Sequence, residues 1–484
     1  MAQRVDRILL SSVMLGNFLA GVAARIFAIS LPSVAHGLET DLVGISWALV
    51  SYELSAISFS VVFGRIGDIY GRLRVYSLGL LFLTASSFLC GLSQNIVQLI
   101  VFRFIQGVAA AMTQSTGRAL AMESMPEGAT ARSQGLMTMA FATGSFLGPS
   151  LGGLIIDFIH WRGIFFFVVP IGAIGTFLAF ANWRRLKAFD STPPSAAKPS
   201  VDYLGAGLLL AATCALLAVL NQRVMEIMTF GQRALLLLLF GGALGGFLLR
   251  ESTVTSPVVD LSLFRIRMFA FSSLSLLLLS ITYGLTLFIL PFYLQEVLHL
   301  SPSFIGVLFM TPPFFTLTLS AAVGSLTDRT GPRLPATAGV SFHVVALFLG
   351  TTLRADSHWL LPAALLALGG LGNALFLTPN HSAMLGSVPA QHRGLATGAL
   401  YLTFNLGMIL GISLGGFLMT KLFRLISGVP TAVPSALDSA AFVTAFNVVF
   451  GVAVGLSLVA LIASAMRGAK VSQQASLYNG RALP

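Results

Sequence analysis

The stretch from Gly64 to Arg74, which reads GRIGDIYGRLR, decides the fold of this chain. It stands between two apolar runs that are each long enough to cross a membrane, so glycines, a carboxylate and arginines are concentrated in one short segment. Gly64 and Gly71 permit a tight turn or a close backbone approach. Asp68 can cap a helix or pair with a neighbouring cation. The stretch predicts a charged cytoplasmic loop between two membrane-spanning helices.

The same pattern returns 260 positions later in the chain. Gly324, Asp328, Gly331 and Arg333 repeat the G-x-x-x-D-x-x-G spacing of the first copy. An ordinary solvated turn would explain one such loop, because charged turns between helices are common. Two copies with equal spacing instead predict a chain built from two related halves.

A second repeat lies outside these loops. The segments 144–153 (GSFLGPSLGG) and 407–416 (GMILGISLGG) share their glycines, two leucines and a serine in register, at nearly the same offset. Parallel repeats of this kind are how many secondary transporters build a central path that opens alternately to either side. The sequence therefore predicts two six-helix halves.

The composition places the chain in a membrane. Of its 484 residues 56% are hydrophobic and 9% are charged, and the mean hydropathy is +0.88, whereas an average soluble protein has roughly 25% charged residues. The net charge of +11 does not indicate nucleic-acid binding, because the basic residues are scattered among short loops without interleaved aromatics. Cys90 and Cys214 fall inside apolar runs, which predicts neither a disulfide nor a metal site.

Fourteen segments are apolar and long enough to span a bilayer, at about 20 residues each. An even number of spans places both termini on one side. With this topology, 19 lysines and arginines fall on the side of the termini and 6 on the other, which predicts cytoplasmic termini. The predicted spans are 8–32, 44–65, 75–93, 97–122, 134–158, 163–183, 203–221, 232–250, 268–295, 303–325, 335–353, 359–380, 395–421 and 440–466.

The expected organisation is an all-α integral membrane fold with an inserted helix pair between its two halves. The segment 184–202 has the composition of a flexible linker, with RRLK followed by STPPSAAKPS. The parts are an N-terminal six-helix half (1–183), this cytoplasmic linker (184–202), the inserted pair (203–250), a cytoplasmic connection (251–267), a C-terminal six-helix half (268–467) and a cytoplasmic tail (468–484).

These residues resemble the fourteen-helix drug:proton antiporter family of the major facilitator superfamily over nearly the whole chain. The resemblance implies the major facilitator fold, a role in antiport and multidrug efflux, and no enzyme activity. It is carried by the loop residues Gly64, Asp68, Gly71, Arg72 and Arg74, by FRFIQG with Arg103, Gln106 and Gly107, by the antiporter motif Gly144, Gly148, Pro149, Gly152 and Gly153, and by DLSLF at 260–264, LPFYLQEVLHLSP at 290–302 and HRGLATG at 392–398.

One departure concerns the first helix, where the family usually carries an acidic residue. Here the region reads AARIFAISLP, with Ala23, Arg25 and Ala28 at the nearest matching positions. The family's usual proton-binding carboxylate is therefore absent from helix one. If the transport is proton-coupled, a carboxylate elsewhere in the membrane has to bind the proton.

Three ionisable side chains stand in mid-helix, at a cost of roughly 2.5–3.5 kcal/mol each on insertion scales. Arg25, Glu53 and Arg103 lie about 10, 13 and 10 Å from the outer ends of their helices, at a rise of about 1.5 Å per residue. They share one depth in one half, which predicts that Glu53 faces one or both arginines and exchanges a proton. The alternative is a permanent Glu–Arg pair that only ties helices together.

Other candidates carry an expected role and a structural alternative. The resemblance implies a gating relay among Asp68, Arg72 and Glu123 on the cytoplasmic side; the alternative is an ordinary interfacial ion pair. Pro149 favours a bend in a helix whose glycines permit close packing; the alternative for 144–153 is tight packing only. The candidate substrate-cavity residues are Gln106, Gln114, His343, Asn373 and Asn405. For the last four of these, the alternative is a polar side chain that only bonds one helix to another.

The function expected is proton-coupled export of amphipathic or drug-like small molecules across a bacterial cytoplasmic membrane, by alternating access. Its partners are a small-molecule substrate, protons and the lipid bilayer, with no cofactor, metal or nucleic acid, and the chain is expected to be a monomer. An alternative is export of an organic anion or lipid, because Arg25 and Arg103 outnumber Glu53. A membrane-embedded enzyme is a further alternative, but the sequence contains no P-loop, HExxH or G-x-S-x-G motif.

Overall fold

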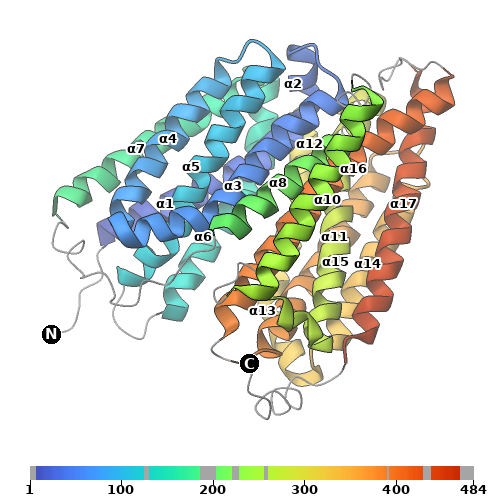
Figure 1. The fold of residues 1–484 in the computed structure, drawn as a ribbon. Helices are drawn as coiled ribbons and strands as arrows, with labels where there is room; N and C mark the ends of the chain where they lie inside the picture. Colours follow the sequence, from blue (N-terminus) through green and yellow to red (C-terminus); the bar gives the residue numbers. More distant parts are fainter. Residues whose placement is uncertain are drawn as a thin grey trace. The chain divides into compact units, whose positions relative to one another are not determined.

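The computed structural model describes residues 7–124, 130–185, 203–220, 228–254, 260–389, 392–428 and 438–468. Every regular element among them is a helix (Figure 1). The helices are α1 (Arg7–Ile29), α2 (Leu31–Gly37), α3 (Leu42–Tyr70), α4 (Arg72–Gly91), α5 (Ile96–Glu123), α6 (Thr130–Phe158), α7 (Gly163–Arg185), α8 (Tyr203–Leu220), α10 (Phe230–Thr253), η2 (Leu261–Arg265), α11 (Arg267–Phe292), η3 (Tyr293–Val297), α12 (Pro302–Phe309), α13 (Thr311–Thr330), α14 (Arg333–Gly350), α15 (Leu360–Gly386), α16 (Arg393–Ser427) and α17 (Ser439–Met466).

Thirteen spans within the described residues are long and apolar enough to cross a membrane. Two of these spans are composite, since α11 continues into the π-helix η3 and α12 continues into α13. The helix α8 has a shorter apolar stretch, Gly207–Leu216. Together they agree with the fourteen apolar segments of the sequence. The all-helical membrane fold predicted from composition is confirmed.

The helices form two compact units. Unit 1 contains residues 1–203 and 300–310, and unit 2 contains residues 204–299 and 311–484. The inserted pair α8 and α10 therefore belongs to unit 2. The short helix α12 belongs to unit 1, although its neighbours in sequence, α11 and α13, belong to unit 2. The sequence repeat alone does not indicate this exchange, because α12 begins the tenth apolar segment of an otherwise regular second half.

Contacts between α6 and α12 explain why α12 packs in unit 1. A Cβ atom on Gly153 would meet the carbonyl oxygen of Pro302, and one on Gly306 would meet the carbonyl oxygen of Pro149. The absence of side chains at these two glycines lets the two backbones approach closely. At the end of α6, the carboxylate of Asp157 accepts hydrogen bonds from the backbone N–H (2.9 Å) and the hydroxyl of Ser303.

The segment 64–74 is mostly helical, not a loop. The helix α3 continues past the predicted end at residue 65 to Tyr70, and α4 begins at Arg72. Charged side chains at the membrane surface are solvated and do not interrupt the backbone hydrogen bonds of a helix. The turn is made by Gly71 alone, with φ of 98°, and its N–H donates to the carbonyl oxygen of Gly67 at 3.0 Å.

The second copy of the pattern makes the same turn in unit 2. Gly331 lies between α13 and α14 with φ of 78°, and its N–H donates to the carbonyl oxygen of Thr327 at 2.8 Å. Positive φ is strained for any residue with a Cβ atom, which explains the glycine at both positions. The structural equivalence of the two turns confirms the duplication predicted from their spacing.

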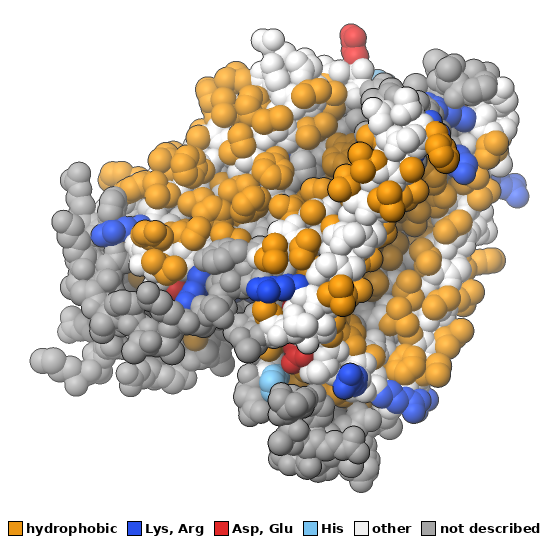
Figure 2. All heavy atoms as spheres, in the orientation of Figure 1, with side chains coloured by type: hydrophobic (Ala, Val, Ile, Leu, Met, Phe, Trp, Pro, Cys, Tyr) orange, Lys and Arg blue, Asp and Glu red, His pale blue; other side chains and the backbone are white. Residues whose placement is uncertain are grey.

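Each unit has its own buried core. In unit 1 one cluster joins α1, α4, α5, α6 and α7; its residues are Leu9, Val13, Leu73, Tyr76, Leu80, Leu120, Ala121, Met137 and Ala179. In unit 2 a larger cluster brings Phe247 of α10 and Leu263 of η2 against α11, α14, α15, α16 and α17. On the face drawn in Figure 2, hydrophobic side chains cover the middle of unit 2, whereas lysines and arginines gather at its two ends. This distribution fits a bundle surrounded by lipid.

The turn at Gly71 yields a test. Gly71→Ala should lower the thermal unfolding temperature in detergent, because alanine at positive φ costs about 1–2 kcal/mol. Gly64→Ala is the matched control, since its added Cβ would meet only the Cβ of Ser115 at an ordinary 3.7 Å. Equal unfolding temperatures for the two variants would show that the turn does not require glycine.

Candidate functional site

The site of unit 1 is framed by close packing of α1 against α6. Gly144, Gly148 and Gly152 follow one another at four-residue intervals on α6 and face α1. A Cβ on Gly144 would meet the carbonyl oxygen of Phe18, and one on Gly148 would lie 3.2 Å from the carbonyl oxygen of Val22. The glycines thus allow backbone-to-backbone contact along two helical turns.

The same arrangement recurs between α11 and α16 of unit 2. Gly407, Gly411 and Gly415 occupy the positions of the three glycines of α6 and face Leu277, Ile281 and Leu285 of α11, respectively. From the opposite side of each contact, Gly21 of α1 packs on Phe141 and Gly284 of α11 packs on Met408. The sequence analysis missed Gly21 and Gly284, although the interval between them equals the interval between Gly144 and Gly407.

Pro149 lies inside α6 and has no equivalent in α16, where Ile412 stands in its place. Proline removes the N–H that would bond to Ser145 and crowds the preceding turn. The hydroxyl of Ser145 donates to the carbonyl oxygen of Gly21 at 3.5 Å. The two units therefore share the glycine contact, but only α6 has a proline within it.

Arg103 of α5 is the centre of the site. Its side chain is only 1% exposed and lies between the rings of Phe27 and Tyr52, with 4.4 Å from the guanidinium carbon to each ring centroid. Its Nε donates to the carbonyl oxygen of Ala48 at 3.1 Å. Cation–π contacts of this kind are strongest where water is excluded. One side chain thereby links α1, α3 and α5.

Gln106 extends this link to α4. Its side-chain oxygen accepts from Arg103 Nη1 at 2.9 Å, and its side-chain nitrogen donates to the hydroxyl oxygen of Ser87 at 2.7 Å. Ser87 in turn donates to the carbonyl oxygen of Leu83 at 2.8 Å. Gln106 is 1% exposed, so both ends of its amide hold helices together. Arg103 Nη2 is buried and has no hydrogen-bond partner among the described residues.

Glu53 and Arg25 lie beside this centre and are partly exposed. Glu53 follows Tyr52 on α3, and the two charges that act on it are Arg25 and, second, Arg103. Its carboxylate forms no hydrogen bond or ion pair with the described part of the chain. Arg25 lies on α1 where α6 passes, since a Cβ on Gly148 would be 3.4 Å from the Cβ of Arg25. The three predicted residues thus come together in unit 1.

The predicted gating residues lie around the junction of α3 and α4. Asp68 and Arg72 form an ion pair across the Gly71 turn, with 2.8 Å between Nη2 and Oδ1 and 2.9 Å between Nε and Oδ1. Arg74 is exposed. The backbone of Glu123 ends α5, and its side chain lies outside what the structure describes. In unit 2 Pro332 stands where unit 1 has Arg72, so Asp328 has no equivalent ion pair among the described residues.

The other cavity candidates are distributed over both units. Gln114 of α5 and Asn373 of α15 are partly exposed. The amide of Asn405 donates to the carbonyl oxygen of Tyr401 within α16 at 2.7 Å. His343 of α14 is 5% exposed and lies 3.0 Å from the hydroxyl of Thr282 of α11. The same hydroxyl donates to the carbonyl oxygen of Leu279 at 2.9 Å.

Apolar spans, two related units and a charged centre in one of them define a polytopic integral membrane protein. The model of the major facilitator superfamily matches residues 13–280 and 272–476. The chain belongs to the major facilitator superfamily. The likeness to transporters, together with this fold, also establishes that the protein is not an enzyme.

Characterised relatives cover most of the chain. It is 29% identical to the riboflavin transporter RibZ of Clostridioides difficile over 84% of this chain and 86% of that protein. It is 29% identical to the multidrug resistance protein Stp of Mycobacterium tuberculosis over 85% and 76% of the two chains, and 26% identical to the tetracenomycin C resistance and export protein of Streptomyces glaucescens over the same shares.

Solved structures share the fold. A peptide transporter POT in complex with sulfate has a TM-score of 0.68 at 15% sequence identity and covers 96% of both chains. A bacterial homologue of the lysosomal transporter Spinster has a TM-score of 0.64 at 13% identity and covers 95% of this chain and 96% of its own. The family resemblance of the sequence motifs is therefore confirmed at the level of the superfamily and its fold.

The α1–α6 contact yields a test. Gly144→Ala should destabilise the protein by about 1–3 kcal/mol, because the new methyl group would overlap the backbone of α1. Gly175→Ala is the control, since its Cβ would lie 3.6 Å from Leu15 and Leu80 side chains, an ordinary contact. The measurement is thermal unfolding in detergent. Similar unfolding temperatures for both variants would contradict the close backbone packing.

The contacts of Arg103 yield a second test of this site. Arg103→Lys keeps the charge but cannot bond Ala48 and Gln106 while lying between two rings, so we expect a loss of about 1–3 kcal/mol in unfolding free energy. Arg329→Lys, at an exposed position at the end of α13, should change stability by less than about 0.5 kcal/mol. A stability of Arg103→Lys equal to wild type would show that the charge alone is needed.

Proposed function

We propose that the protein is a proton-coupled exporter of amphipathic or drug-like small molecules that works by alternating access. The proposal rests first on Glu53, whose partly exposed carboxylate forms no hydrogen bond or ion pair with described residues and lies in the field of Arg25 and Arg103. Burial favours the neutral acid and guanidinium groups favour the carboxylate. A small movement of either arginine would therefore change the proton affinity of Glu53.

The energy scales support this coupling. One pKa unit corresponds to about 1.36 kcal/mol, whereas one charge that crosses 100 mV gains about 2.3 kcal/mol. A change of one to two units in the pKa of Glu53 between conformations is thus comparable in free energy to one charge that crosses the membrane potential. Glu53 would replace the carboxylate that the family usually carries in helix one, and the Pro149 bend would shape the alternation. Relatives named for multidrug resistance and export support export of drug-like compounds.

The orientation proposed is that of the positive-inside rule, with both termini in the bacterial cytoplasm. In this orientation the Asp68–Arg72 pair lies on the cytoplasmic side. The pair joins α3 and α4 across a turn of a single residue. Together with Glu123, it would hold the cytoplasmic side closed in the outward-open state. The gating role of these residues remains a proposal that rests on the family resemblance.

A second candidate function is transport of an organic anion. Two guanidinium groups and one carboxylate leave a net positive charge near the centre of unit 1, which would attract a negatively charged solute. A relative at 29% identity is named a riboflavin transporter, so relatives of this similarity are not all named for drug resistance. Competition between organic cations and organic anions during uptake into inverted vesicles separates the two candidates.

Glu53→Gln tests proton coupling. Addition of a transported compound to purified wild-type protein should release protons, and Glu53→Gln should abolish the release because the amide does not titrate. Glu39→Gln is the control, since Glu39 is an exposed carboxylate of the same unit. Binding of the compound, measured in parallel, shows that each variant is intact. Unchanged proton release by Glu53→Gln would remove Glu53 from the coupling role.

A further inference from the structure

Two arginines meet at the end of α17 in unit 2. Arg467, directly after the helix, donates from Nε to the carbonyl oxygen of Ser464 at 3.1 Å and from Nη2 to the Ser464 hydroxyl at 2.8 Å. Arg267, at the start of α11, donates from Nε to the carbonyl oxygen of Met466 at 3.1 Å. Both Nε groups therefore satisfy carbonyl groups that the end of a helix leaves without a partner.

Arg333 lies at the same end of unit 2. It begins α14, one turn before Thr337, whose hydroxyl lies 3.0 Å from the hydroxyl of Ser464. The helices α14 and α17 run antiparallel, since Asn447 near the other end of α17 bonds to Leu353 beyond the other end of α14. Arg333 and Arg467 are each about one turn beyond the Thr337–Ser464 contact. Three guanidinium groups thus occupy the ends of three neighbouring helices.

Arg467 is the unusual member because its side chain is 0% exposed. Its Nη1 is buried without a hydrogen-bond partner, and its guanidinium carbon lies 5.7 Å from the ring centroid of Phe376. Burial lowers the pKa of Arg467 to about 10, so it remains charged at neutral pH. A buried charge is costly unless an opposite charge compensates it.

No carboxylate of the described chain supplies that compensation. The helices α11, α14 and α17 contain no Asp or Glu, and no described carboxylate lies within ion-pair distance of Arg267, Arg333 or Arg467. Asp260, an acid of the same unit, instead accepts from Ser262 and pairs with His392 at 3.8 Å. The helix carbonyls accept hydrogen bonds from the Nε groups of Arg267 and Arg467, and the Ser464 hydroxyl accepts one from Nη2 of Arg467. The other Nη groups of these arginines can therefore bind an anion.

We propose that this end of unit 2 binds the phosphate of an anionic phospholipid headgroup. Arg267 and Arg333 are exposed and make the contact, while buried Arg467 supplies the charge that needs an anion. Guanidinium groups bind phosphate oxygens in pairs through parallel N–H donors. The ends of membrane-spanning helices lie at the level of lipid headgroups, where basic pockets between helices favour anionic lipids. A lipid is therefore the source of phosphate that this position selects.

Native mass spectrometry of the full chain tests the proposal. The protein is released from micelles that contain phosphatidylglycerol and phosphatidylcholine in equal amounts, and bound lipid is counted by mass. Wild type should retain phosphatidylglycerol selectively. The double variant Arg267→Gln and Arg333→Gln should retain about thirtyfold less, since each basic residue near the headgroups contributes about 1 kcal/mol and the variant removes two. Both side chains are exposed, so the fold should persist, and single Arg333→Gln is the milder second variant.

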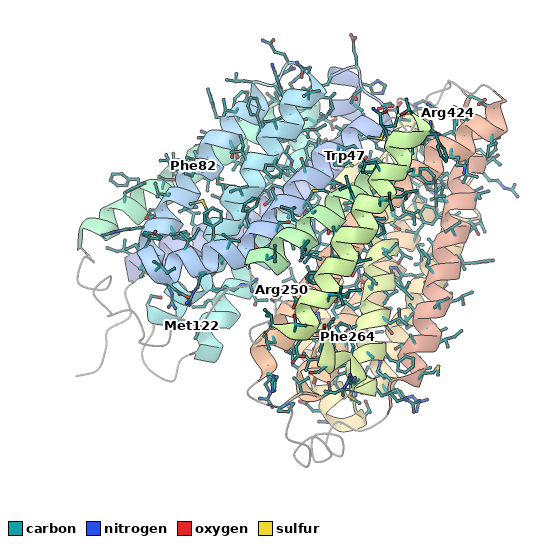
Figure 3. The ribbon with its side chains drawn as sticks, viewed as in Figure 1. Trp47, Phe82, Met122, Arg250, Phe264 and Arg424 are labelled. Atoms are coloured by element: carbon teal, nitrogen blue, oxygen red, sulfur yellow. The ribbon has the colours of Figure 1, made fainter. Side chains whose placement is uncertain are left out.

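The matched control is the double variant Lys421→Gln and Arg424→Gln. Arg424 lies at the end of unit 2 opposite the end near Phe264, as Figure 3 shows, and Lys421 is one turn away on α16. These substitutions remove the same charge and should leave phosphatidylglycerol binding unchanged. A loss of binding in this control as large as in the test variant would show that net charge alone attracts the lipid, which overturns the proposed site.

Two further outcomes overturn the proposal. Equal retention of phosphatidylglycerol by wild type, the double variant and Arg333→Gln would show that these arginines do not bind the headgroup. Displacement of the lipid by millimolar inorganic phosphate, with phosphate bound in its place, would identify a site for free phosphate and not for lipid.

Discussion

Direct contact between helix backbones is the constraint on which both units depend. Lipid chains are as apolar as the helices, so burial of apolar side chains does not hold two helices together in a membrane, and close packing must do so. Gly144 and Gly148 of α6 and Gly411 of α16 let a neighbouring backbone reach the position where a Cβ atom would otherwise lie. A single methyl group on one of these glycines would separate the helices.

The polar centre of unit 1 is built on this packing. Once α1 is fixed against α6, Phe27 of α1 faces the guanidinium of Arg103, and Tyr52 of α3 covers its other face. Gln106 and Ser87 continue the network to α4. Arg103 therefore has a structural role that can be stated from its contacts, whereas Glu53 differs because its carboxylate forms no hydrogen bond with the described residues. A structural arginine beside an available acid is the arrangement on which the proposed proton coupling relies.

The duplication preserves packing more faithfully than polar chemistry. The turns at Gly71 and Gly331 and the glycine contacts of α6 and α16 match between the units. Among the described residues of unit 2, the ion pair Asp68–Arg72 has no counterpart, and Ile412 stands where unit 1 has Pro149. The shared features keep the helices together in each unit, and the features found in one unit only are those to which the family resemblance assigns gating and bending. Unit 2 instead has three arginines at the ends of α11, α14 and α17, with no described carboxylate at ion-pair distance.

The sequence by itself determined the membrane fold, the spans and the duplication, because a bilayer requires about 20 apolar residues for each helix and glycine is needed at a positive φ. It also predicted that Arg25, Glu53 and Arg103 lie together in one half, and in the structure Arg25 and Arg103 are the charges that act on Glu53. It could not predict that α3 continues to Tyr70, that α12 packs in unit 1, or that Arg103 is held by Phe27 and Tyr52. These features depend on how each helix is rotated about its axis. In helices that are apolar on every side hydropathy leaves that rotation open, and only the packing of neighbouring helices decides it.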